Sequence, residues 1–190
     1  GETFTRIASN TGYKVELLQQ LGLTSQYGKD FFRGRVMFPI HSITGKVLGF
    51  GGRTLSADKK IPKYINSPET DIYLKSKIVF GIFQARKAIT QLEECYLVEG
   101  YMDVISLSQS GIENVVASSG TSLTQDQVRL IKRYTPNLTI LYDGDSAGVK
   151  AALRGLEIAL EEGMNVKVVL LPADDDPDTY VQKLGADGFR

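Results

Sequence analysis

From residue 78 onward, short apolar runs alternate with helical stripes. Four runs have the length and composition of buried strands: residues 95–98, 115–117, 138–142 and 166–171. Between and around them, apolar residues recur every three or four positions, which predicts helices over about 82–92, 102–110, 124–134 and 147–162. Strands that alternate with helices are typical of a parallel sheet covered by helices. The pattern therefore predicts an α/β fold for this part of the chain.

The preceding residues show a different pattern. Residues 35–40 alternate apolar and polar side chains and 47–50 form a second apolar run, so the pair predicts a hairpin in which Pro39 marks an edge strand. A helix is expected over 14–21, ending at Gly22. Residues 1–13 carry no periodic signal.

Ser67 and Pro68 have the character of a helix N-cap and first helical residue, which predicts a helix reaching about Lys75. The change of pattern lies near residues 77–94. We therefore divide the chain into a smaller, mixed α+β subdomain at 1–80 and a mainly parallel α/β domain at 81–190.

The composition is that of an ordinary globular protein, with 42% hydrophobic and 23% charged residues among 190. A single cysteine excludes an internal disulfide, and one cysteine with one histidine argues against a zinc site. No apolar stretch is long enough to span a membrane and no signal peptide opens the chain, so a reducing cytoplasm is the expected location.

The net charge of zero conceals a strong asymmetry. Residues 1–90 hold 14 Lys and Arg against 6 Asp and Glu, whereas residues 91–190 hold 8 against 16. A basic half beside an acidic half suggests a polyanion held against a metal-binding face. The alternative is that the two halves neutralise each other across an interface, and charge alone leaves both open.

Carboxylates follow three of the expected strands: Glu99, the pair Asp143 and Asp145, and the pair Asp176 and Asp178. Because the carboxyl ends of parallel strands share one edge, we expect these side chains to meet there. Clustered carboxylates repel one another unless a cation neutralises them, and hard oxygen ligands favour Mg²⁺. Such a site suits phosphoryl or nucleotidyl transfer.

Neighbouring residues allow more than one role. Gly100 and Gly144 are expected to keep the approach to the metal free of side chains. Asp103, one turn beyond Glu99, is a metal ligand, a partner of a ligand, or a residue favoured by the positive end of its helix. Tyr101 either stacks on a base or packs.

Seven blocks resemble, in order, those of the bacterial replicative primases of the DnaG type, and the acids resemble the Toprim signature. The blocks are residues 35–40, 49–53, 62–64, 66–70, 98–103, 142–145 and 176–178. The resemblance implies a core that joins ribonucleotides on a single-stranded DNA template during replication. It also implies partners that act through regions this chain lacks, namely a replicative helicase and a zinc-binding module. The last helices of the core are expected to be absent, and the compartment is the bacterial cytoplasm, near the nucleoid.

The same resemblance assigns roles to individual residues. It assigns catalysis to Glu99, Asp143 and Asp145. It assigns the binding of magnesium, or of manganese in its place, to these three residues together with Asp176, Asp178 and the nearby Asp103. Nucleotide and DNA binding is assigned to Arg35, Arg53, Lys63, Tyr64, Asn66, Lys75, Gly100 and Tyr101. No zinc is expected in this fragment.

Two other functional classes remain open on sequence grounds. One is a different Toprim enzyme, a nuclease or topoisomerase subunit, which would use the same acids to break phosphodiesters. The other is a non-catalytic nucleotide-sensing or DNA-binding module. A haloacid-dehalogenase-type phosphatase also carries Asp-x-Asp after a strand, but its following residues differ from Ser146 and Ala147.

Overall fold

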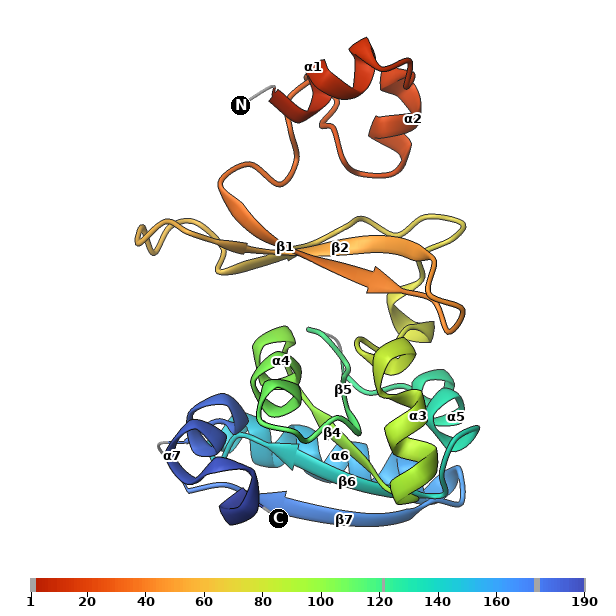
Figure 1. The fold of residues 1–190 in the computed structure, drawn as a ribbon, viewed down its shortest axis with the longest axis vertical. Helices are drawn as coiled ribbons and strands as arrows, with labels where there is room; N and C mark the ends of the chain where they lie inside the picture. The colour runs from red at the N-terminus through yellow and green to blue at the C-terminus, as the bar shows by residue number, and fades with distance from the viewer. Residues whose placement is uncertain (1–2, 121, 173–174, 190) are drawn as a thin grey trace. The chain divides into compact units, whose positions relative to one another are not determined.

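The computed structural model describes residues 3–120, 122–172 and 175–189, and the chain divides into two compact units (Figure 1). The first unit comprises residues 1–41 and 46–74, and the second comprises residues 42–45 and 75–190. Within the described residues, no helix has both the length and the apolar character needed to cross a bilayer.

The second unit is built on a parallel sheet of four strands. These are β4 (Cys95–Val98), β5 (Val115–Ala117), β6 (Asn137–Tyr142) and β7 (Asn165–Leu170), in the order β5-β4-β6-β7. All three pairings are parallel, which confirms the α/β prediction. The carboxyl ends of the four strands consequently lie along one edge.

Helices cover both faces of this sheet (Figure 1). One face packs against α3 (Ile82–Leu92), α5 (Gln125–Lys132) and α6 (Ser146–Glu161), and the other against α4 (Tyr101–Gln109) and α7 (Pro177–Phe189). The predicted start of α5 is confirmed: Thr124 Oγ1 accepts from Gln127 N, and the Gln127 side chain accepts from Thr124 N.

The first unit contains an antiparallel sheet in the order β1-β2-β3, formed by β1 (Arg35–His41), β2 (Val47–Thr54) and β3 (Tyr64–Asn66). The predicted hairpin is β1–β2, and Pro39 lies on the edge strand, where a missing N–H is tolerated. The helix expected over 14–21 is α2 (Val15–Gln20), and Gly22 follows it at φ +66°.

The helix expected from Ser67 to Lys75 was wrong. Ser67 N donates to Phe50 O, and Ser67 Oγ accepts from Phe50 N, so the residue extends the β2–β3 ladder instead of capping a helix. Thr70 and Tyr73 then pair across a tight turn, and Tyr73 is only 3% exposed. The single helical turn nearby is the 3₁₀ segment η1 (Lys75–Lys77).

A helix that the sequence did not indicate, α1 (Thr3–Asn10), lies in the stretch without periodic signal. Its apolar residues Phe4 and Ile7 are exposed while Thr5 is buried, so the usual core stripe is absent. The carboxylate of Asp30 accepts hydrogen bonds from Phe4 N, Thr5 N and Thr5 Oγ1. The first turn of α1 is thus capped by a residue more than twenty positions away, which no local pattern reveals.

Candidate metal and nucleotide site

The predicted acids lie at the carboxyl edge of the parallel sheet. Glu99 directly follows β4 and Asp143 directly follows β6, and these two strands are neighbours. Asp176 and Asp178 flank the first residue of α7, which follows the loop after β7. The sheet therefore brings acids from three separate segments to one edge, as the spacing predicts.

The surroundings of the Glu99 side chain suit a residue that binds a cation. Its Oε1 is buried and has no hydrogen-bond partner among the described residues. Burial raises the pKa of Glu99, the charges of Asp143 and Asp145 raise it further, and a hydrogen bond from the Asp143 backbone opposes the change. A buried carboxylate oxygen without a donor is costly, and a bound cation would remove that cost.

Asp103 lies in the first turn of α4, where its Oδ2 accepts a hydrogen bond of 2.9 Å from Gly100 N. Burial raises the pKa of Asp103 to about 7 against this hydrogen bond, and the charges of Asp176, Asp143 and Asp178 add to the rise. These acids are therefore close enough to oppose one another's ionisation, although they come from three segments.

Two of the other acids already hold local structure. Asp145 Oδ1 caps α6 by accepting from Ala147 N at 2.9 Å and Gly148 N at 2.7 Å. Asp176 Oδ1 accepts from the backbone N and Oγ1 of Thr179, both at 2.7 Å. Each of these bonds engages Oδ1, and a carboxylate has a second oxygen for a cation.

Within the described part of the chain, no three Asp, Glu, His or Cys side chains converge into a ready-made metal shell. The charge of Asp143 nevertheless raises the pKa of both Glu99 and Asp103, so these acids lie within electrostatic reach of Asp143. The donor set consists of carboxylates and includes one buried, unsatisfied oxygen, which fits a hard divalent cation. Such an ion would draw together side chains that repel one another without it.

Three glycines at the site have close neighbours. A Cβ at Gly144 would lie 2.2 Å from Leu171 O, so close packing against the residue that follows β7 requires a glycine at this position. A Cβ at Gly148 would similarly lie 2.2 Å from Asp143 O, so α6 approaches the acid-bearing turn closely. At Gly100 the nearest atom would be Asp103 Oδ2, at 3.1 Å.

In the first unit, part of the predicted nucleotide-binding set lies together. Arg53 on β2 pairs directly with Tyr64 on β3, and Asn66 lies two residues along β3. Lys63 Nζ is 5.9 Å from the centre of the Tyr64 ring, within cation–π range. Arg53 and Lys63 are exposed and able to contact phosphate.

Three further members of that set are placed differently. Arg35 Nη1 donates to Gly52 O at 3.1 Å and to Pro62 O at 2.9 Å, so this cation also holds the sheet together. Lys75 belongs to η1 in the second unit. Tyr101 is 3% exposed and packs edge-on against Phe80 with ring centres 4.7 Å apart, so the expectation that it contacts nucleotide is wrong: the ring is a core residue.

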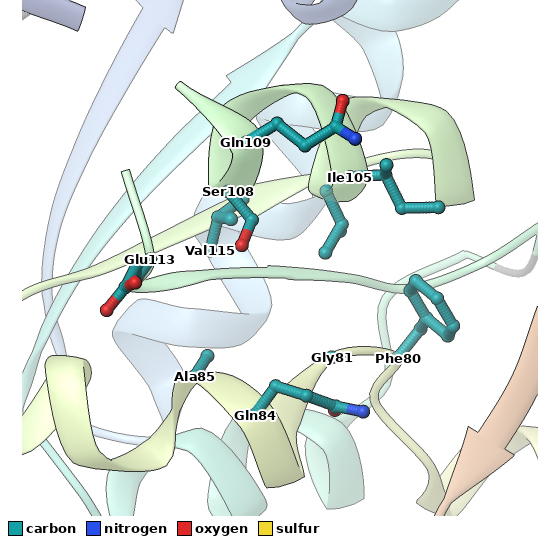
Figure 2. Close-up of a pocket in the computed structure, with 10 residues that line it drawn as sticks. Phe80, Gly81, Gln84, Ala85, Ile105, Ser108, Gln109, Glu113 and Val115 are labelled. Carbon is teal, nitrogen blue, oxygen red and sulfur yellow. The ribbon is translucent and has the colours of Figure 1, made fainter. Parts of the chain in front are cut away.

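A separate pocket of about 210 Å³ lies where α3 and α4 meet the edge strand β5 (Figure 2). Its wall is mainly apolar and includes Phe80, Val104 and Ile105, with Glu113 near its margin. None of the predicted acids lines it, so this pocket is distinct from the carboxyl-edge site.

Both units resemble known protein families. Residues 1–86 match the family model for the DNA primase catalytic core, N-terminal domain, and residues 96–181 match the Toprim-like family model. The chain belongs to the DnaG primase family. The DNA primase of Staphylococcus aureus (strain COL) is 42% identical over 183 residues, which are 94% of this chain but 30% of that protein. This chain therefore spans less than a third of the length of such primases.

Solved primase structures share the fold. The Aquifex aeolicus primase, comprising zinc-binding and RNA polymerase domains, superposes with a TM-score of 0.91 at 38% identity, over 100% of this chain and 48% of that one. A DnaG primase catalytic domain bound to ssDNA gives a TM-score of 0.85 at 43% identity, over 96% of this chain and 62% of that one.

The structure also places beside the predicted acids a residue that the sequence did not indicate. Ser106 on α4 is buried, and its Oγ donates to Asp178 Oδ1 at 2.6 Å. Gln182 Nε2 donates to the same oxygen. Ser106 and Asp178 are 72 positions apart, so only the packing of α4 against α7 brings them together.

Proposed function

We propose that this chain is the part of a primase RNA polymerase core that joins ribonucleotides on a single-stranded DNA template, with divalent metal held at the carboxyl edge of the parallel sheet. The observation that carries the proposal is the buried, unsatisfied Oε1 of Glu99 beside Asp143. The likeness to a DnaG catalytic domain that binds ssDNA supports the choice of template.

The acids divide into two groups in this proposal. Glu99 and Asp143 are the central ligands, because they follow adjacent strands and their charges interact. Asp145 and Asp176 complete the set from helix starts whose backbone they already cap. Asp178 adds to it from the first turn of α7, and Asp103 supports them from α4. These residues would hold Mg²⁺, which would offset the negative charge that develops on the phosphate during transfer.

The exposed cations of the first unit supply phosphate contacts. Arg53 pairs with Tyr64 across β2 and β3, and Lys63 lies over the Tyr64 ring, so this region offers two charges and one aromatic face. Such contacts hold nucleic acid without reading its sequence, and their strength falls as salt rises. The charge of +8 over residues 1–90 supports this assignment.

The alternative that the chain is another Toprim enzyme, a nuclease or a topoisomerase subunit, explains only the second unit. Such enzymes would share the acids of the second unit. The match of residues 1–86 to a primase N-terminal domain supports primase over these alternatives and over a non-catalytic module.

The decisive experiment is binding of a ribonucleoside triphosphate in Mn²⁺ and in EDTA, measured by calorimetry for the wild-type chain and for Asp143→Asn. We expect binding to require both Mn²⁺ and Asp143, because Asn keeps the shape but removes the charge. Asp187→Asn, an exposed position on α7, is the matched control for net charge. Equal binding by Asp143→Asn, with the circular dichroism spectrum unchanged, would remove Asp143 from the site.

A further inference from the structure

Three residues form one row across the carboxyl edge of the sheet. In the β4–β6 ladder Leu97 pairs with Ile140, so two residues later Glu99 lies beside Tyr142. In the β4–β5 ladder Val98 pairs with Ala117, so one residue later Glu99 lies beside Ser118. The backbone bonds continue past the strands in agreement with this register, because Ser119 N donates to Glu99 O at 3.1 Å.

All three side chains project to the same face of the sheet. Side chains alternate along a strand, so Glu99 shares the face of Leu97, and Ser118 shares that of Val116. Leu97, Val116 and Tyr142 belong to one core cluster, the one beneath α3, α5 and α6. Glu99 therefore stands between Ser118 on one side and Tyr142 on the other.

A hydrogen bond joins the two outer members of this row. The side chains of Tyr142 and Ser118 are hydrogen-bonded to each other, and both residues are buried, at 3% and 7% exposure. Their strands lie on opposite sides of β4, about 10 Å apart at ordinary strand spacing. The bond therefore crosses β4 on the face that carries Glu99.

We propose that Tyr142 and Ser118 are positioning residues whose hydroxyl–hydroxyl hydrogen bond separates Glu99 from the apolar core and holds its carboxylate towards Asp143. This role rests on the proposed metal site. Without such a support, repulsion from Asp143 would drive the flexible glutamate side chain away from the position a metal requires. Groups behind metal ligands commonly fix ligand orientation in this way.

The chemistry of the pair agrees with this role. Burial raises the pKa of Tyr142 to about 12, against the hydrogen bond with Ser118 and with the Glu99 charge adding to the rise, so the phenol keeps its proton. A phenylalanine in its place would preserve the packing of the ring in the core and remove only the hydroxyl.

The test compares Tyr142→Phe, Ser118→Ala, the double variant and Ser118→Thr in the 190-residue chain. The first readout is the Mn²⁺ dissociation constant, obtained from the electron paramagnetic resonance signal of free Mn²⁺. Each removal of a hydroxyl is expected to weaken Mn²⁺ binding about tenfold or more. The double variant should be no weaker than either single variant because both remove the same bond, and Ser118→Thr should bind as wild type.

A second readout does not depend on metal. Three-bond couplings of labelled glutamate report the Glu99 χ1 rotamer, which should be single in the wild-type chain and averaged in Tyr142→Phe. Tyr73→Phe removes the hydroxyl of another tyrosine that is 3% exposed, but from the first unit, and should change neither readout.

The outcomes separate the two proposals. A Mn²⁺ dissociation constant within twofold of wild type in Tyr142→Phe and Ser118→Ala would overturn the positioning role, even if the variants unfold at lower temperature. Unchanged Glu99 couplings would overturn it as well. Failure of the wild-type chain to bind Mn²⁺ would instead overturn the proposed metal site, and the couplings alone would then decide whether Tyr142 holds Glu99.

Discussion

Replacement of Asp103 by Asn should stabilise the metal-free protein above neutral pH. In the folded chain, burial raises the pKa of Asp103 from 3.8 to about 7, with contributions from the neighbouring acids. Ionised Asp103 therefore opposes folding, whereas an Asn side chain carries no charge. Asn also keeps an oxygen that can accept the hydrogen bond from Gly100 N, so the start of α4 is preserved.

The magnitude and the sign both follow from the pKa change. At 1.36 kcal/mol per pKa unit, a rise from 3.8 to about 7 corresponds to roughly 4 kcal/mol between the two protonation states. The folded-state pKa lies above the unfolded one, so the favourable contribution of protonated Asp103 is complete below about pH 4 and is lost as the pH rises through 7. We expect Asp103→Asn to raise the free energy of unfolding by about 2–4 kcal/mol at pH 8, and by much less at pH 4.

Urea denaturation followed by circular dichroism would measure this difference at pH 4 and at pH 8 in EDTA. Asp187→Asn changes the net charge equally at an exposed position of α7 and should alter stability by less than about 0.5 kcal/mol. Added Mg²⁺ should stabilise the wild-type chain more than Asp103→Asn, because the ion favours the ionised acids.

A neutral or destabilising effect of Asp103→Asn at pH 8 in EDTA would refute this reasoning. It would mean that ionised Asp103 is not opposed by burial and by the surrounding acids in the folded chain. An equal stabilisation at both pH values would refute it too, because the effect would then have nothing to do with ionisation.

Two further predictions concern binding and packing. Lys63→Ala should weaken single-stranded DNA binding and reduce the slope of log affinity against log salt concentration by about one, while Mn²⁺ affinity stays constant. Fluorescence anisotropy and Mn²⁺ titration would measure the two effects, with Lys14→Ala as the control. An unchanged slope would argue against a phosphate contact at Lys63. Gly144→Ala should lower the free energy of unfolding, measured in urea, by about 3 kcal/mol or more, because its Cβ would lie 2.2 Å from Leu171 O. A decrease of less than about 1 kcal/mol would mean that the residue following β7 moves aside readily.

The parallel sheet could be predicted because its signals are local. Short apolar runs marked β4, β5, β6 and β7 to within one or two residues, and the capping box at Thr124 marked the start of α5. Since parallel strands end at a common edge, the placement of Glu99 and Asp143 there followed from the order of the elements alone.

Structure that depends on contacts between distant residues could not be predicted from local sequence patterns. The cap of α1 comes from Asp30, and Ser67 pairs with Phe50 across the β2–β3 ladder, so the first helix was missed and another was predicted where none forms. Tyr101 is a similar case, because contact with Phe80 buries a ring that the sequence left free to bind nucleotide.

Local sequence signals indicated the kind of chemistry: carboxylates at strand ends, cations in the first ninety residues, and the segments that carry them. The surroundings of each acid depend on the fold. Among the described residues Glu99 Oε1 has no hydrogen-bond partner, Asp103 is buried near other acids, and Asp145 caps α6. The physical reason is that burial, repulsion and hydrogen bonding depend on which segments pack together, and a linear sequence does not state those distances.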